Sequence, residues 1–231
     1  MLCRSFAFLA LALAASPIPA GAESAQQLLP APALDVEPGG AGEQTAIFAG
    51  GCFWGIQGVF QHVRGVKQAV SGYAGGTIAD PSYEQVSTDT TGHAESVRVT
   101  FDPAQVSYGT LLRIFFSVGL DPTQVNRQGP DVGMQYRSDL FVLDASQERV
   151  ARAYLAQLTA AQVYDRPIAT RIDAAGPFYQ AEAYHQDYLE LHPRQPYIAI
   201  NDIPKVHALE RLFPEYWRPK PVTVGMLAAG G

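Results

Sequence analysis

Cysteine is almost missing from this sequence. Its 231 residues include two, Cys3 and Cys52, and Cys3 lies in a segment with the pattern of a removable export signal. With Cys52 alone, a mature chain forms no internal disulfide, and a thiolate zinc site has too few ligands. A lone thiol in an exported chain indicates a reactive or intermolecularly paired cysteine. A buried, inert thiol is the alternative.

Charged residues are also scarce. Asp, Glu, Lys and Arg make up 16% of the chain, and 22 acidic residues outnumber 16 basic ones. The net charge of −6 argues against nucleic acid or an anionic membrane surface as a partner. The five histidines form no close pair at helical spacing, and the glycine-rich stretches lack a phosphate-binding pattern. We therefore expect no metal, no nucleotide cofactor and a monomeric chain.

Residues 1–22 have the pattern of a signal peptide. Arg4 provides a basic start, residues 6–15 form an apolar stretch, and Ala20-Gly21-Ala22 is a small-residue cleavage site. The apolar stretch is shorter than the roughly 20 residues that span a membrane. We expect export to the periplasm or the medium, with no membrane attachment after cleavage. An uncleaved anchor is the alternative.

The rest of the chain divides into three parts. Residues 23–43 are rich in Ala, Pro, Gly and Gln and predict a flexible lead-in, residues 44–218 a folded domain, and residues 219–231 a C-terminal tail. Residues 74–94 and 118–137 have little regular pattern and predict long ordered loops.

Apolar periodicity predicts strands at 45–49, 68–73, 95–101, 140–143 and 168–172, and helices at 52–62, 107–116, 144–161 and 182–191. This alternation indicates a two-layer α+β or α/β domain.

The motif Gly50-Gly51-Cys52-Phe53-Trp54-Gly55 stands where a strand ends and a helix begins. The free N–H groups of a helix N-terminus favour an anion, so we expect a lowered thiol pKa and a nucleophilic thiolate. The glycines permit a tight turn and the close approach of a substrate. Phe53 is expected either in the core or beside the sulfur, and Trp54 is expected to line a cleft.

Two polar segments offer further chemistry. At the end of Thr90-Thr91-Gly92-His93-Ala94-Glu95, a desolvated Glu95 would serve as a general acid. His93 is either a base or a hydrogen-bonded structural residue, and an exposed loop acid is the alternative for Glu95. Between residues 121 and 138, Asp131 and Tyr136 could orient water or a polar substrate, or they could belong to a self-bonded loop.

In this order and spacing, the motifs resemble those of the peptide methionine sulfoxide reductases of type A, over residues 45–192. The resemblance implies that residues 44–218 are a methionine sulfoxide reductase catalytic domain. It also implies a ferredoxin-like α+β fold, a two-layer core of mixed sheet and helices wrapped by long ordered loops. The matching motifs are Gly51-Cys52-Phe53-Trp54-Gly55, Gly92-His93-Ala94-Glu95, Asn126-Arg127-Gln128-Gly129, Gln135-Tyr136-Arg137-Ser138, Ala175-Gly176-Pro177-Phe178 and His185-Gln186-Asp187-Tyr188.

The resemblance also implies an activity, the reduction of methionine S-sulfoxide, free or in peptides and proteins (EC 1.8.4.11). Cys52 would attack the sulfoxide sulfur and become a sulfenic acid, while Glu95 would protonate the oxygen. The residues that resemble the hydrogen-bonding partners of that oxygen are Tyr83, Asp131 and Tyr136. The residues that would form the apolar pocket for the methyl group are Phe53 and Trp54.

The sequence departs from many relatives at its C-terminal end. They often carry resolving cysteines there, whereas residues 193–231 contain none. We therefore predict that an external thiol, such as glutathione or a thioredoxin-type dithiol protein, reduces Cys52, and that no cofactor takes part.

Two other functions are consistent with parts of the sequence. Cys52 with His93 or His185 could form a cysteine hydrolase, which needs a base within reach of the thiol. A binding module could instead recognise oxidised or apolar side chains at Trp54. Replacing Glu95 by Gln separates the reductase from the hydrolase, because only the reductase needs that acid.

Overall fold

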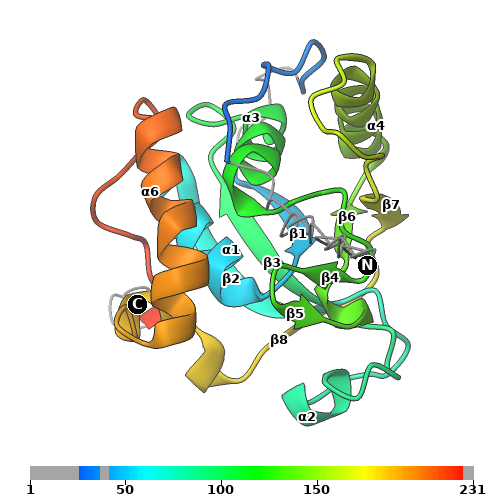
Figure 1. Ribbon diagram of the computed structural model, residues 1–231, viewed down its shortest axis with the longest axis vertical. Helices are drawn as coiled ribbons and strands as arrows, with labels where there is room; N and C mark the ends of the chain where they lie inside the picture. The colour runs from blue at the N-terminus through cyan, green and yellow to red at the C-terminus, as the bar shows by residue number, and fades with distance from the viewer. Residues whose placement is uncertain (1–25, 37–41, 226–231) are drawn as a thin grey trace, which may run out of the picture.

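A six-stranded sheet forms the centre of the computed structural model, which describes residues 26–36 and 42–225 (Figure 1). The strand order is β7-β6-β1-β3-β2-β8, and every neighbouring pair is antiparallel except β6 and β7. A separate ribbon joins β4 and β5. The strands are β1 Gln44–Gly50, β2 Val66–Ala74, β3 Ala94–Phe101, β4 Arg127–Gln128, β5 Asp131–Val132, β6 Ser138–Val142, β7 Arg171–Ala174 and β8 Phe178–Gln180.

Helices and short helical turns connect these strands. The α-helices are α1 Phe53–Gln61, α2 Tyr83–Val86, α3 Tyr108–Ile114, α4 Ala145–Ala160, α5 Tyr188–Leu191 and α6 Ile203–Leu212. The π-helical turns are η1 Phe115–Gly119 and η4 Ile198–Asp202, and the 3-10 turns are η2 Met134–Tyr136 and η3 Ala183–His185. The fold is therefore α+β with a mixed sheet, as the alternation of patterns predicts.

The main core lies between one face of the sheet and the helices α1, α3, α4 and α6. Val97, Val99 and Phe101 of β3 are fully buried, whereas the intervening Arg98 and Thr100 are partly exposed, which is the alternation that the sequence predicts. Aromatic rings join the layers, since Phe48 of β1 stacks on Phe60 of α1 at 4.8 Å between ring centroids. This packing fixes α1, and with it the residue that precedes α1, against the sheet.

Several elements differ from the predicted ones. The helix predicted at 182–191 is divided into η3 and α5, because Asp187 has a left-handed backbone with φ of 57°. The strand predicted at 168–172 begins later, as β7 at Arg171, where it pairs with Asp139 of β6. The predictions omit β8 and α6.

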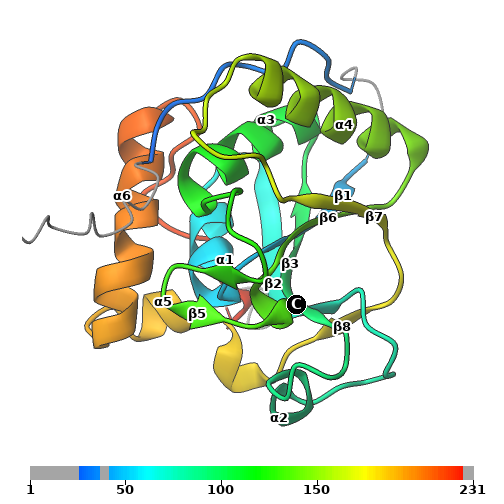
Figure 2. The same ribbon diagram turned by 45° about the vertical axis from the view of Figure 1, so that its right-hand side comes forward.

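Residues 26–36 run along the helical layer beside α3 and α4 (Figure 2). Leu29 is buried, its backbone N–H donates to Ser117 Oγ at 3.2 Å, and its carbonyl accepts from Arg113 Nε at 2.7 Å. This packing differs from the flexible lead-in that composition predicts for residues 23–43. An extended segment held by one apolar side chain and its own backbone has no periodicity for sequence analysis to detect.

The predicted signal peptide, residues 1–22, lies outside the described residues. Within residues 26–36 and 42–225, no helix is both long and apolar enough to cross a membrane. Residues 222–225, in the predicted C-terminal tail, lie against the domain, where the Val222 N–H donates to the Gln61 carbonyl at 3.0 Å.

Candidate active site

Cys52 stands between β1 and α1, as the sequence predicts, and is 8% exposed. The turn that places it there depends on Gly51, whose φ is +92°. A Cβ atom on Gly51 would lie 2.5 Å from Gln128 Cβ, so neither the backbone conformation nor the space permits a side chain. Strand β4, which ends at Gln128, is thereby packed directly against the turn that carries the thiol.

Glu95, near the start of β3, is buried beneath the first turn of α1. Its Oε2 accepts the backbone N–H of Phe53 at 3.0 Å, which satisfies one of the free N–H groups at the helix N-terminus. Burial raises the pKa of the Glu95 carboxyl to about 8, against the lowering effect of that hydrogen bond. At neutral pH most of the carboxyl therefore carries a proton, as a general acid requires.

The pKa of the Cys52 thiol is raised, whereas the sequence predicts a lowered one. Burial raises its pKa well above the ordinary value, and Glu95, in its ionised form, and Asp202 add to the rise. The backbone N–H of Trp54 and the charge of Lys205 act in the opposite direction and are the weaker influences. The helix N-terminus is present, but desolvation outweighs it, so the resting sulfur is a protonated thiol.

The aromatic side chains after Cys52 have separate environments. Phe53 is buried, and its ring meets the edge of His185 at 5.0 Å between centroids. Trp54 is partly exposed and stacks on Tyr188 at 3.9 Å. Its indole Nε1 donates to His185 Nδ1 at 3.1 Å. Phe53 thus belongs to the core, whereas Trp54 has the exposure that a cleft residue needs.

The predicted oxygen-side residues come from three short elements: Tyr83 from α2, Asp131 from β5 and Tyr136 from η2. Tyr83 begins α2, and its backbone N–H is held by Glu182 Oε1 at 2.8 Å. Burial raises the pKa of the Tyr83 and Tyr136 phenols, and the charges of Glu95 and Cys52 add to the rise in both. Burial also raises the pKa of Asp131, and the negative charge of its carboxylate adds to the raised pKa of both phenols. The charges of these residues therefore influence one another, and both phenols carry their protons at neutral pH.

Tyr197 contacts two of the predicted site residues, Asp131 and Trp54, and sequence analysis did not predict it there. Its hydroxyl donates a short hydrogen bond to Asp131 Oδ2, and its ring meets Trp54 edge-on at 6.0 Å between centroids. Burial raises its pKa, with the negative charge of Cys52 as the next cause. The apolar residues around Tyr197 gave no periodicity, because η4 is a π-helical turn and α6 follows it directly.

The histidines of the hydrolase alternative are engaged elsewhere. The ring Nδ1 of His93 accepts from the Gly76 N–H at 3.2 Å, and its Nε2 lies 2.8 Å from the Ile78 carbonyl. His185 is bonded to Trp54. Among the hydrogen bonds of the described residues, none joins an imidazole to the Cys52 thiol. The described part of the chain also holds no group of three or more residues arranged for a metal ion.

Comparison with known proteins identifies the family. Its sequence profile, described as peptide methionine sulfoxide reductase, matches residues 44–216. The chain belongs to the peptide methionine sulfoxide reductase family. MsrA 2 of Mesorhizobium japonicum is 55% identical over 188 residues, which cover 81% of this chain and 96% of that protein. MsrA of Deinococcus radiodurans is 52% identical over 177 residues, covering 77% and 85%.

Solved structures of the family have a similar fold. Reduced Mxr1 from Saccharomyces cerevisiae superposes with a TM-score of 0.60 at 31% identity, over 68% of this chain and 90% of that one. Methionine sulfoxide reductase A of Corynebacterium diphtheriae gives 0.57 at 33% identity, over 68% and 79%. The chain is therefore an oxidoreductase of the peptide-methionine sulfoxide reductase class, EC 1.8.4.11.

Proposed function

We propose that Cys52 reduces methionine S-sulfoxide by direct attack on sulfur, with Glu95 as the acid. The observation that carries the proposal is the hydrogen bond between Glu95 Oε2 and the Phe53 N–H, one residue after Cys52. It holds a carboxyl with a pKa of about 8 at the turn that bears the thiol. A sulfoxide oxygen leaves poorly until it is protonated, so a protonated acid next to the nucleophile is what the reaction needs.

The neutral phenols and the aromatic rings have complementary roles in this proposal. Tyr83 and Tyr136 donate hydrogen bonds to the sulfoxide oxygen, and Asp131 with Tyr197 fixes the polar wall beside them. Trp54 receives the substrate methyl group with Phe53 behind it. As the oxygen gains a proton, sulfur acquires positive character, and an indole face can stabilise that charge.

The reaction balances with one thiol on the enzyme and two from outside. The sulfoxide oxygen passes to Cys52, which yields methionine and the Cys52 sulfenic acid. A first external thiol forms a mixed disulfide with Cys52 and releases water. A second thiol attacks this disulfide, frees the Cys52 thiol and leaves as the external disulfide. No described cysteine other than Cys52 offers an internal route.

A single-turnover experiment tests this scheme. The enzyme is mixed with one equivalent of the S or R epimer of N-acetylmethionine sulfoxide without thiol, and Cys52 is examined by mass spectrometry. We expect one equivalent of methionine product from the S epimer, with Cys52 oxidised by one oxygen or dehydrated to a sulfenamide. Cys52→Ser should form no product. Continuous turnover without added thiol, or product from Cys52→Ser, contradicts the proposal.

Two finer points belong to the same proposal. A ferredoxin-like core of β1, α1, β2, β3, α3 and β6 is supported by the antiparallel strand order β6-β1-β3-β2.

Export is supported by the signal pattern of residues 1–22. N-terminal sequencing of the protein from a periplasmic fraction should begin at Glu23, and recovery of intact Met1 from the cytoplasm alone contradicts export.

A further inference from the structure

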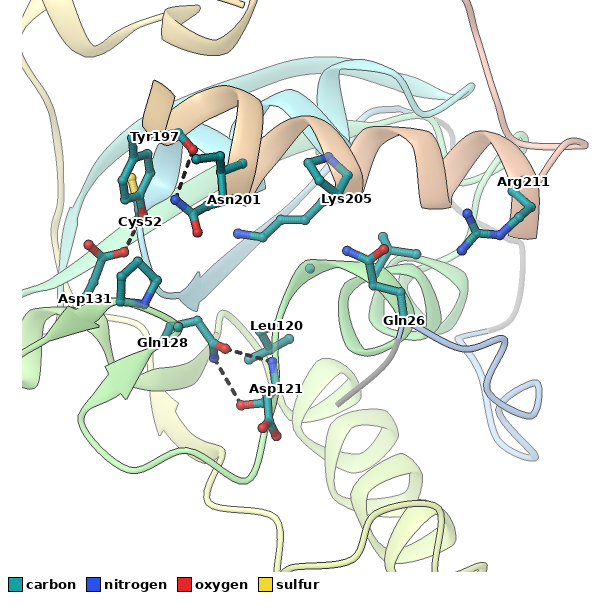
Figure 3. Close-up of a pocket in the computed structure, with 16 residues that line it drawn as sticks. Gln26, Cys52, Leu120, Asp121, Gln128, Asp131, Tyr197, Asn201, Lys205 and Arg211 are labelled. Carbon is teal, nitrogen blue, oxygen red and sulfur yellow. Dashed lines mark hydrogen bonds between the residues drawn. The ribbon is translucent and has the colours of Figure 1, made fainter. Parts of the chain in front are cut away.

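A cavity of about 530 Å³ begins at Cys52 and follows α6 (Figure 3). Cys52, Asp131 and Tyr197 lie at one end, and Gln26 and Arg211 at the other. Among the described residues, the lining does not include Trp54 or Glu95. The cavity therefore continues from the polar side of the candidate active site, Asp131 and Tyr197, along α6. The volume lies in the range of small-molecule sites.

The wall that α6 contributes is basic. Lys205 extends into the cavity, with its Nζ 3.1 Å from Oδ1 of the buried Asp202. Arg211 is exposed and makes no ion pair with a carboxylate in the described part of the chain. A ligand at this wall would thus meet one partly compensated cation and one uncompensated cation.

The acids of the opposite wall are already engaged. Asp121 accepts from Arg166 Nη2 at 3.0 Å and from the Thr123 hydroxyl at 2.7 Å. Asp131 accepts from the Tyr197 hydroxyl. Arg211 has no carboxylate partner among the described residues and lies at the end of the cavity opposite Cys52 and Asp131, so that end favours an anionic group.

The spacing along α6 suits a short peptide. Lys205 and Arg211 are six helical residues apart, which is about 9 Å at the usual rise. An extended chain of three residues spans roughly 10 Å. A thiol in the middle of such a peptide could reach Cys52 while a terminal carboxylate reaches the basic wall.

We propose that this cavity binds the reducing thiol, a small peptide-like monothiol whose carboxylates are held by Lys205 and Arg211. The proposal rests on the proposed function, because it places the two external thiols of that cycle. The first loses its proton and bonds to the Cys52 sulfenic sulfur as water leaves. The second attacks the mixed disulfide and is released as the external disulfide.

Two other occupants fit the observations less well. The residues around a methionine in a protein vary in charge, so they have no constant partner for fixed cations. A dithiol protein must bring its cysteine to a sulfur that is 8% exposed within a concave wall, which a small thiol does more readily. Both occupants are outcomes of the experiment below.

The experiment isolates the reductive half of the cycle. Cys52 is first oxidised with one equivalent of sulfoxide, and mass spectrometry confirms the oxidised form. Rates of reduction are then measured with glutathione, its neutral diester and the cationic thiol cysteamine. We expect glutathione to exceed its diester at least tenfold at low salt. Arg211→Ala should lower this ratio about tenfold, and Arg211→Glu should shift the preference toward cysteamine. Arg149→Ala, which removes a cation from the exposed face of α4, is the control and should leave the ratio unchanged.

Three results overturn the proposal. One is a glutathione-to-diester ratio near one in the unmodified enzyme. Another is an effect of Arg211→Ala on the KM of a sulfoxide peptide instead of on the thiol ratio, which assigns the cavity to the substrate. The third is reduction by a thioredoxin-type protein that far exceeds glutathione. Failure of the proposed function is distinct, because Cys52 then stays unoxidised before any thiol is added.

Discussion

The indole of Trp54 donates its only hydrogen bond to Nδ1 of His185, at 3.1 Å. An indole N–H cannot accept, so the neutral imidazole carries its proton on Nε2. Burial lowers the pKa of His185 below its ordinary value, against the opposing charge of Glu182. A second proton on the ring would place an N–H on His185 Nδ1, facing the Trp54 N–H. The hydrogen bond would then be lost, and Trp54 would be released from this position.

We expect the KM for methionine sulfoxide to rise at acidic pH, below the ordinary titration range of histidine, because burial lowers the pKa of His185. Because the folded state disfavours the second proton of His185, the stability from this contact is present above the unfolded pKa and is lost as the pH falls below it. His185→Phe removes the acceptor and should raise the KM about tenfold at every pH. The check is KM and kcat for N-acetylmethionine S-sulfoxide between pH 5 and 8.

His185→Asn is the matched control, since its side-chain oxygen can accept from the indole without titrating. This variant should keep most of the affinity and lose the acidic rise in KM. An unaltered acidic rise in His185→Asn would show that another group causes it.

Glu95 gives a prediction at the opposite end of the pH range. With a pKa of about 8, the carboxyl loses its proton above that pH, so the rate of sulfoxide reduction should fall there. Glu95→Gln keeps an acceptor for the Phe53 N–H but cannot supply a proton. We expect it to lower the single-turnover rate by roughly 10² to 10⁴. Rapid-quench measurement of methionine product provides the check.

The same substitution has a stability consequence. A carboxyl whose folded pKa is raised keeps its proton in the folded state, so its contribution to stability declines as the pH rises from about 4.5 to 8. Glu95→Gln should remove that decline in urea unfolding. Glu84→Gln, on the exposed face of α2, should alter neither rate nor stability. A full rate in Glu95→Gln would exclude Glu95 as the acid.

The contrast between β3 and α6 shows what sequence alone can predict. The alternation of Val97, Val99 and Phe101 is local, and the strand follows it. The cap of α4 is also local, since Asp144 accepts from the N–H groups of Ser146 and Gln147. Such features depend on neighbours in sequence and are therefore predictable.

The missed features depend on contacts between distant segments. Tyr197 reaches Asp131 across 66 positions in sequence. Desolvation of Cys52 comes from the packing of the whole domain, so a helix N-terminus alone gave the wrong direction for its pKa. For α6 a signal was present, because Pro204 lies in its first turn, where proline is favoured.

Gly55 tests the contact between α1 and the segment that follows Tyr197. A Cβ atom there would lie 2.2 Å from Asp202 Oδ1 and 3.0 Å from Lys205 Nζ. Alanine ordinarily favours a helix over glycine, but this overlap must move a buried carboxylate. We expect Gly55→Ala to lower the free energy of unfolding by about 1–3 kcal/mol, as overpacking does. Urea denaturation measures the change.

Gly176→Ala is the control for that substitution, because a Cβ atom at Gly176 meets nothing within 4 Å. Its free energy of unfolding should change by less than about 0.5 kcal/mol. Equal effects at the two glycines would mean that the Asp202 contact does not limit the packing of α6 against α1.

Leu29 and its neighbour Leu28 provide a matched pair for the N-terminal segment. Leu29 is 1% exposed, whereas Leu28 is 51% exposed. The carbonyl after Leu29 is also held, since Tyr154 donates its hydroxyl to the Pro30 carbonyl at 2.9 Å. If this segment is part of the folded domain, Leu29→Ala should cost about 2 kcal/mol in unfolding free energy, the lower end for a buried leucine, because the segment can partly relax.

Leu28→Ala should change the free energy of unfolding by no more than about 0.5 kcal/mol, since its side chain already faces water. Urea unfolding of both variants gives the comparison, and limited proteolysis shows whether cleavage within residues 26–36 becomes faster in Leu29→Ala alone. Local detachment would accelerate that cleavage with little loss of global stability, whereas integral packing lowers both together. Indistinguishable behaviour of the two variants would return residues 26–36 to the flexible lead-in that composition predicts.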